Sequence, residues 1–462
     1  MPFISIEFLA LVVLTFTCYY LHSLRKLQVA ILVAASLIFY AWDQWRLLPL
    51  LVLAVVVTYF SMGGAIRGNR TLATLGVVSN LLILCFFKYK FLIAPNPANL
   101  HSGSDVLDLL MRLPLPIGIS FFVFHNISLI VDYFKYGRDR EKPTAIQVML
   151  YILFFPQLVS GPITRAISFI PQIELKLFKN VPWIQAGQLL VAGLFFKLFC
   201  ANNLAQITAL MAPDFSPNSG GGDKLFLLFT YSFQIYADFY GYSTIALGLA
   251  LLFGYRLPIN FRLPYTSSSF SDFWNRWHIS LSMWLRQYLY IPLGGNRISP
   301  VRTYINLLIV MVLGGLWHGA SLSYAVWGFA HGALLVVERY GAQTIERHVP
   351  GYQFNLVAKV AYSAFVFVCV SLCWLLFRFQ EFSQASSYCR SILDNPFQFK
   401  MPGIWYGLAI LYMVPVFLQH ALARRVAFIS KNKALTGIFF GVLLWLALAE
   451  RGADTQFIYF RF

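Results

Sequence analysis

Charged residues are scarce in this chain. Only 11% of its 462 residues are Asp, Glu, Lys or Arg, whereas 59% are hydrophobic, and the mean hydropathy is +0.67. Because soluble globular domains carry about 25% charged residues, this composition excludes an ordinary soluble protein. A membrane-crossing helix needs about 20 mainly apolar residues, and about a dozen such runs are present, joined by short polar loops. We therefore expect an all-α, polytopic membrane protein that forms a single domain over residues 1–462.

The sequence also lacks the motifs of several common chemistries. It contains no GxxxxGK[ST] phosphate loop, no GxGxxG, no HExxH and no GxSxG. These absences argue against nucleotide hydrolysis, a zinc protease site and an activated serine of the chain's own. The six cysteines are scattered, and Cys369 and Cys373, one helical turn apart, have no metal-site spacing. We interpret them as packing residues and expect no bound metal.

Acidic residues are the rarer charged class, with 18 Asp and Glu against 35 Lys and Arg. In a membrane protein this excess is explained by basic cytoplasmic loops, so we expect contacts with membrane lipids and no nucleic-acid partner. Residues 94–110, in contrast, contain two Asp and neither Lys nor Arg. The basic loops are residues 22–28, 64–70, 135–142 and 424–433. Placing these loops inside makes residues 5–21 an uncleaved first span and leaves both termini outside.

Polar residues interrupt three apolar stretches, and ionisable groups cost about 2.5–3.5 kcal/mol at membrane depth. The first stretch, Ser232 to Tyr265, carries Asp238 and Tyr242 in an apolar background. These side chains are candidates for a functional site. Hydrogen bonding between helices, which would only fix their packing, is the alternative.

The second stretch, Phe270 to Arg297, is too polar for a simple span and too aromatic for a loop. Arginine side chains suit phosphate groups, so the stretch could form an anion-recognising floor at the cytoplasmic interface. If the stretch is helical, His278 lies on the same helix face, or stripe, as Trp274 and Ser282. An interfacial amphipathic helix without chemistry is the alternative. The candidate donor-binding residues are Asn275, Arg276, Arg286 and Arg297.

The third stretch, GGLWHGASLSYAVWG, places His318 inside what is otherwise a membrane-buried helix. Glycine pairs four residues apart, at 315 and 319 and at 328 and 332, predict close helix packing. A buried neutral imidazole there could act as a base, or it could simply hydrogen-bond to a neighbouring helix. On an unbroken helix His331 points about 220° away from His318, so we do not expect the two to act as a pair.

Six blocks of the sequence together resemble one enzyme family. They are LPIGISFFVFHNISLIVDYFK, FFPQLVSGPITR, QIYADFYGYSTIALGLALLFGYRLPINF, FWNRWHISLSMWLRQYLYIPLGGNR, GGLWHGA and FIYFRF. In this order they are similar to the membrane-bound O-acyltransferase (MBOAT) family, in particular its bacterial branch that includes the membrane subunit of alginate O-acetylation. The resemblance implies a ring of about eleven spans around a thin centre, with short helices dipping in from the cytoplasmic face.

The resemblance also implies roles for single residues. His318 of the WHG block is the residue expected to be essential, and His278 of the RWHIS block is the second polar site. Acetyl-CoA is the expected donor substrate, and no bound cofactor is expected. The expected location is the bacterial inner membrane, with a periplasmic partner of the SGNH acetyltransferase type and a polysaccharide acceptor. Trp317, Asp238, Tyr242 and Gln287 are the residues expected to line the substrate tunnel.

The chain departs from the alginate subunit at several positions. It has DFYGYST and WLRQY where DFSGYSD and WLRDY are expected, so Tyr240, Thr244 and Gln287 replace a small polar residue and two acids. The identity of the acceptor therefore stays open. A lipid or protein hydroxyl as acceptor is one alternative. Another is a transporter of a small anion or lipid-linked sugar, which would also need polar residues at mid-membrane.

Overall fold

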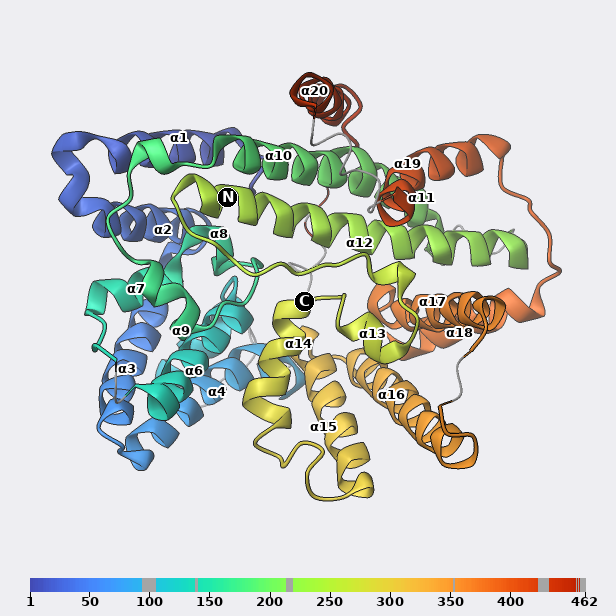
Figure 1. The fold of residues 1–462 in the computed structure, drawn as a ribbon, viewed down its shortest axis with the longest axis horizontal. Coiled ribbons are helices and arrows are strands. Elements are labelled where there is room, and N and C mark those ends of the chain that lie inside the picture. The colour runs from blue at the N-terminus through green and yellow to red at the C-terminus, as the bar shows by residue number, and fades with distance from the viewer. Residues whose placement is uncertain are drawn as a thin grey trace. The chain divides into compact units, whose positions relative to one another are not determined.

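The fold, taken from a computed structural model, has helices and no strands among the residues that it describes (Figure 1). These residues are 1–93, 105–137, 140–212, 219–351, 354–422, 432–453, 455 and 457. The chain divides into two compact units. The first comprises Met1–Gly187 and Ala246–Pro258, and the second comprises Gln188–Ile245 and Ile259–Phe462. The single domain over residues 1–462 stays a prediction.

Seven helical segments of the described residues are long and apolar enough to cross a membrane. One of them, His22–Ile66, has 45 residues and contains two successive α-helices, each preceded by a short 3₁₀ helix. Two shorter apolar helices, Ile6–Tyr20 and Lys433–Ala449, lie near the ends of the chain. The prediction of an all-α, polytopic membrane protein is therefore confirmed. The other candidate spans are Arg70–Lys90, Trp183–Met211, Gly221–Leu252, Pro300–His318, Leu356–Arg378 and Gly403–Ala421.

Buried amide side chains bring three helices of the first unit together. Asn80 on α4 donates to the hydroxyl of Thr58 on α3 at 3.1 Å, and Asn126 on α6 donates to Asn80 at 2.7 Å. All three residues are buried, so these bonds satisfy polar groups that have no access to water. The helices of this unit are α1 (Ile6–Tyr20), α2 (Gln28–Gln44), α3 (Leu48–Ile66), α4 (Arg70–Ile93), α5 (Asp105–Arg112), α6 (Ile119–Tyr136), α7 (Ala145–Leu153), α8 (Phe155–Leu158) and α9 (Ala166–Phe169).

The second unit contains the histidine motifs, and π-helical turns interrupt its helices at Phe195–Ala201 and Arg286–Tyr290. Two long helices, α10 (Trp183–Leu194) and α12 (Gly221–Leu252), have residues in both units. The remaining helices are α11 (Asn202–Thr208), α13 (Phe270–Trp274), α14 (Ile279–Leu285), α15 (Pro300–His318), α16 (Leu322–His348), α17 (Leu356–Arg378), α18 (Phe382–Asp394), α19 (Gly403–Leu422) and α20 (Lys433–Ala449).

Helices α15 and α16 form a tightly packed hairpin in the second unit (Figure 1). A Cβ atom added to Gly315 would lie 2.1 Å from the carbonyl oxygen of Tyr324, and one added to Gly328 would lie 2.2 Å from that of Met311. Any larger residue at either position would force the two backbones apart. The prediction that these glycines allow close helix packing is confirmed.

Candidate functional site

His318 is the last residue of α15, and it lies at the turn of the α15–α16 hairpin. Gly319 has an extended backbone, with φ −170° and ψ 161°, and so ends the helix. The hydroxyl of Ser321 then accepts from the amide of Ser323 and begins α16. The side chain of His318 is 4% exposed and packs against the rings of Trp327 and Phe377, with centroids 5.3 and 4.9 Å away. The turn thus presents a buried imidazole in an aromatic enclosure.

His278 lies between two short helices rather than within one. Helix α13 ends at Trp274, and α14 begins at Ile279, so His278 occupies the N-cap position of α14. Its backbone is left-handed, with φ 43° and ψ 53°. The prediction of one helical stripe joining Trp274, His278 and Ser282 is therefore wrong, because the left-handed turn at His278 changes the direction of the chain.

Trp317 brings the two predicted catalytic histidines to the same place. Its ring centroid lies 4.8 Å from that of His318 and 6.2 Å from that of His278. All three side chains are buried, at 6%, 4% and 1% exposure. Sequence segments 40 residues apart therefore meet around one indole ring, and this is the candidate site.

The pKa of His278 follows from its surroundings. Burial lowers the pKa of this imidazole to about 3, so the ring is neutral at pH 7. The ring of Phe239 on α12 stands nearly perpendicular to it at a centroid distance of 4.7 Å. A neutral imidazole can both accept and donate a proton or hydrogen bond, which is what acid–base chemistry at this site needs.

His331 is closer to His318 than the sequence predicted. The two imidazoles contact the same indole, that of Trp327, at centroid distances of 4.8 and 5.3 Å. The expected 220° separation assumed an unbroken helix, whereas the chain reverses at Gly319. His331 is also enclosed by the rings of Phe273 and Trp274, so it forms part of the same aromatic cluster.

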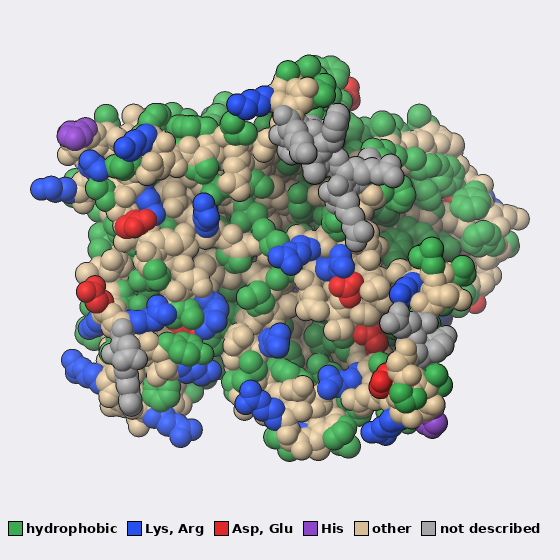
Figure 2. Space-filling model, viewed as in Figure 1, with side chains coloured by type: hydrophobic (Ala, Val, Ile, Leu, Met, Phe, Trp, Pro, Cys, Tyr) green, Lys and Arg blue, Asp and Glu red, His purple; other side chains and the backbone are tan. Residues whose placement is uncertain are grey.

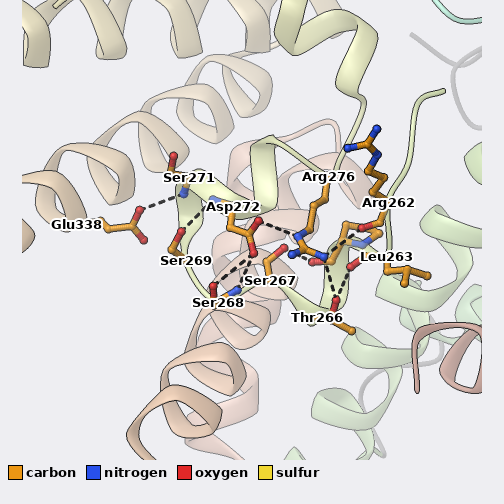
Figure 3. A network of polar contacts seen from close by, with 11 residues as sticks. Arg262, Leu263, Thr266, Ser267, Ser268, Ser269, Ser271, Asp272, Arg276 and Glu338 are labelled. Carbon is orange, nitrogen blue, oxygen red and sulfur yellow. Dashed lines mark hydrogen bonds and ion pairs between the residues drawn. The ribbon is translucent and has the colours of Figure 1, made fainter. Parts of the chain in front are cut away.

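Arg276 is held in a network of polar contacts (Figure 3). Its Nε donates to Asp272 at 2.7 Å, and its guanidinium also reaches the carbonyl of Arg262 and the hydroxyl of Thr266 at 3.5 and 3.4 Å. Burial opposes the ionisation of Asp272, but hydrogen bonds from Arg276 and Ser268 outweigh it and hold the pKa of this carboxyl below its usual value. Arg276 therefore fixes the local fold just before His278, in addition to any contact with a donor.

The remaining predicted donor-binding residues lie at the surface. Asn275, Arg286 and Arg297 are exposed, and the predicted tunnel residue Gln287 is partly exposed in the π-helical turn Arg286–Tyr290. On the face shown in Figure 2, blue Lys and Arg side chains clearly outnumber red Asp and Glu side chains. An exposed guanidinium is available to an anion, which suits the predicted role of Arg286 and Arg297.

Asp238 forms an ion pair that the sequence analysis missed. Its carboxylate accepts from Lys197 at 2.6 Å, and the two side chains are only 5% and 6% exposed. Lys197 lies in the π-helical turn Phe195–Ala201 and also donates to the carbonyl of Thr455 at 3.1 Å. A lysine inside the apolar run LFFKLFC was the sequence signal, since a lone cation at membrane depth requires a partner.

The described part of the C-terminal segment packs beside the same helix face. Phe457 stacks on Tyr242 at a centroid distance of 4.3 Å and contacts Phe239 at 5.8 Å. Because Phe239 also contacts His278, the predicted tunnel residue Tyr242 is linked to the histidine site through two phenyl rings. Most of the terminal FIYFRF block and of the basic loop 424–433 lies outside the described residues.

Known proteins with similar sequences carry out acyl transfer. The probable alginate O-acetylase AlgI of Pseudomonas syringae is 37% identical over 78% of this chain and 68% of its own length. The peptidoglycan O-acetyltransferase of Helicobacter pylori is 35% identical over 87% of this chain and 83% of its own length. The teichoic acid D-alanyltransferase of Bacillus subtilis is 26% identical over 63% of this chain and 74% of its own length.

A match at the level of the family covers both histidine motifs. The sequence pattern of the membrane-bound O-acyltransferase family matches residues 64–379, which include His278 and His318. A membrane-bound family agrees with the helical fold and its candidate spans. This chain belongs to the membrane-bound O-acyltransferase family, and it is an O-acyltransferase.

Proposed function

We propose that the protein moves an acetyl group from a cytoplasmic thioester, acetyl-CoA, across the bacterial inner membrane for the O-acetylation of a cell-envelope or secreted polysaccharide. The similarity to an alginate O-acetylase and a peptidoglycan O-acetyltransferase supports acetyl as the acyl group and a glycan as the final acceptor. The observation that carries the proposal is the meeting of His318 and His278 around Trp317 in a buried, aromatic enclosure.

The proposed reaction needs one base and one donor of hydrogen bonds. His318 removes the proton from an acceptor hydroxyl, whose oxygen forms a bond to the carbonyl carbon of the thioester. The carbon–sulfur bond then breaks, and the leaving thiolate takes the proton from the His318 imidazolium. His278, neutral because of its burial, donates a hydrogen bond to the oxyanion that forms on the way. Exclusion of water by the surrounding rings limits hydrolysis of the thioester.

The donor approaches from the side of the basic loops in this proposal. The exposed Arg286 and Arg297 attract the phosphates of acetyl-CoA, while Arg276 keeps the segment before His278 in place. The tunnel toward the acceptor is lined by Trp317, Tyr242 and Gln287. Asp238 acts there together with Lys197 as an ion pair.

The proposed architecture is a ring of about eleven spans with both termini in the periplasm. A periplasmic partner of the SGNH type receives the acetyl group on its serine and passes it to the polysaccharide. The absence of a GxSxG motif in this chain supports the need for such a partner. The basic loops then face the cytoplasm, as the distribution of Lys and Arg indicates.

The experiment is thioester turnover by purified protein in liposomes, with acetyl-CoA on the side of the basic loops and a periplasmic partner of the SGNH type as acceptor on the other side. His318→Gln, which keeps a side chain of similar size, is compared with wild type and with His348→Gln, a change at an exposed histidine of α16. We expect release of free CoA by wild type and His348→Gln only. Normal release by His318→Gln would refute the role of this histidine. Solute transport without CoA release by wild type would replace the acyltransfer proposal by a transporter.

A further inference from the structure

We infer that Asn260 is a positioning residue that holds the imidazole of His278 in place for acyl transfer. The inference rests on the proposed function in one respect, namely that His278 takes part in the reaction. Asn260 lies in the extended segment between α12 and α13, 18 residues before His278, and it is 1% exposed. It stands near the end of the block QIYADFYGYSTIALGLALLFGYRLPINF, and no role was predicted for it from the sequence.

The backbone at His278 needs an external constraint. Among the described residues with a side chain, only Leu263 and His278 have positive φ values, 52° and 43°. A left-handed conformation at such a residue costs about 1–3 kcal/mol and persists only when the surrounding structure imposes it. The strain therefore raises the question of which contacts hold His278 in this conformation.

The segment that contains Asn260 supplies backbone contacts on both sides of His278. The carbonyl of Asn260 accepts from the amide of Ile279 at 3.0 Å, immediately after the histidine. The amide of Arg262 donates to the carbonyl of Arg276 at 3.0 Å, two residues before it. These two bonds hold the backbone before and after His278, so the chain cannot relax into a continuous helix from α13 to α14.

The side chain of Asn260 adds a second pair of contacts. Its Nδ2 donates to the hydroxyl of Ser243 on α12 at 3.0 Å, and its Oδ1 accepts from the hydroxyl of Ser280 on α14 at 2.6 Å. All three residues are at most 3% exposed, so water does not compete for these bonds. The arrangement needs a donor and an acceptor on one short side chain, which asparagine provides.

These contacts link His278 to the helix that it packs against. Ser243 follows Phe239 by four residues on α12, and the Phe239 ring contacts the His278 imidazole at 4.7 Å. Asn260 therefore ties the start of α14 to α12 one helical turn from this ring contact. Loss of the tie would let the imidazole move relative to Trp317 and His318, and a displacement of about 1 Å at a reacting group can cost about 100-fold in rate.

The test combines kinetics with a direct view of the imidazole. In Asn260→Ala we expect kcat to fall by about 10- to 100-fold while KM for the thioester stays unchanged, because alignment is lost and donor binding is not. Asn260→Asp keeps an acceptor for Ser280, and the Ser243 hydroxyl can turn to donate to its second oxygen, so this variant should retain more of kcat than Asn260→Ala. Ser280→Ala, a smaller change, provides the same comparison if Asn260→Ala does not fold.

The imidazole is observed by NMR of protein labelled with ¹⁵N-histidine, in which His278→Gln identifies the His278 signal by its loss. We expect Asn260→Ala to shift or broaden that signal. Asn306→Ala is the matched control, since it removes another fully buried asparagine of this unit whose bonds go to the carbonyls of Leu293 and Gly295. The His278 signal should be unchanged in this control.

The outcomes separate the positioning role from the proposed function. An unchanged His278 signal in Asn260→Ala overturns the inference, whether or not kcat falls, because the residue would then act by another route. An unchanged kcat in a variant with a displaced His278 signal overturns it as well. If wild type turns over no thioester, the proposed function fails, while the NMR comparison still decides whether Asn260 holds the imidazole.

Discussion

The buried pair of Lys197 and Asp238 allows a quantitative prediction about stability. Replacing Lys197 by Met keeps a long apolar chain but removes the positive charge that lies 2.6 Å from the Asp238 carboxylate, which is 5% exposed. Breaking a buried ion pair in this way costs about 3–5 kcal/mol, mostly because the remaining charge is left uncompensated. We therefore expect Lys197→Met to lower the free energy of unfolding by that amount.

The double variant Lys197→Met/Asp238→Asn measures how much of this cost comes from the interaction between the two side chains. With the charge removed as well, stability should return to within about 1–2 kcal/mol of wild type, since buried ion pairs are often replaceable by neutral groups at little cost. If Asp238→Asn alone also costs about 3–5 kcal/mol, the coupling energy between the two positions is at least about 4 kcal/mol. Glu174→Gln is the control, because Glu174 is 73% exposed and its pair with Lys176 should contribute less than about 1 kcal/mol.

The assay is reversible unfolding by SDS in mixed micelles, followed by tryptophan fluorescence, for wild type, both single variants at this pair, the double variant and the control. A double variant as unstable as the sum of its single variants would refute the reasoning, because the two side chains would then be energetically independent. A cost below 1 kcal/mol for Lys197→Met would refute it as well, since the carboxylate would have to be well solvated.

Three further predictions concern packing, pH and donor binding. Gly315→Ala should destabilise the protein by about 1–3 kcal/mol through overpacking. Gly341→Ala, whose added Cβ would meet no atom within 4 Å, should instead stabilise helix α16 by about 0.5–1 kcal/mol. Unfolding in SDS measures both variants, and equal effects would contradict the packing argument. Because burial lowers the pKa of His278 to about 3, its contribution to stability is complete above the unfolded pKa of about 6.5 and is lost as the pH falls toward 3. The stability of wild type relative to His278→Gln should therefore fall by about 2 kcal/mol between pH 7 and pH 5, and a pH-independent difference would argue against a buried neutral ring. Replacing Arg286 and Arg297 by Gln should raise KM for acetyl-CoA, leave kcat unchanged and weaken the dependence of KM on salt; a fall in kcat at constant KM would place these residues in the chemical step instead.

The sequence predicted the membrane-spanning helices, one tightly packed helix pair and the histidine motifs. Runs of apolar residues predicted the spans, because the bilayer core sets the length of a crossing helix. The glycine spacings around His318 predicted the tight packing of α15 against α16, since close approach depends on the absence of a side chain at given positions. The histidine motifs were also recognisable, because each is contained within a few consecutive residues.

The tertiary structure decided how the motif residues meet. Helical periodicity placed His278 on one stripe and turned His331 away from His318, but both conclusions assumed unbroken helices. The chain breaks at His278, where the amide of Ile279 bonds to the carbonyl of Asn260, and it reverses after His318, so that both His318 and His331 reach Trp327. A hydrogen bond to a distant segment outweighs local helix propensity, and no local pattern records it.

Two contacts of the second unit have the same origin. One is the ion pair between Lys197 and Asp238, and the other is the contact of both histidines with Trp317. Each joins residues about 40 positions apart, and each exists because folding brings their helices together in a buried environment where charges and rings need partners. The sequence by itself therefore determined the helices, the close-packed hairpin and the residue types of the site. Only the tertiary structure determined which side chains face one another, because that depends on the packing of helices that are remote in sequence.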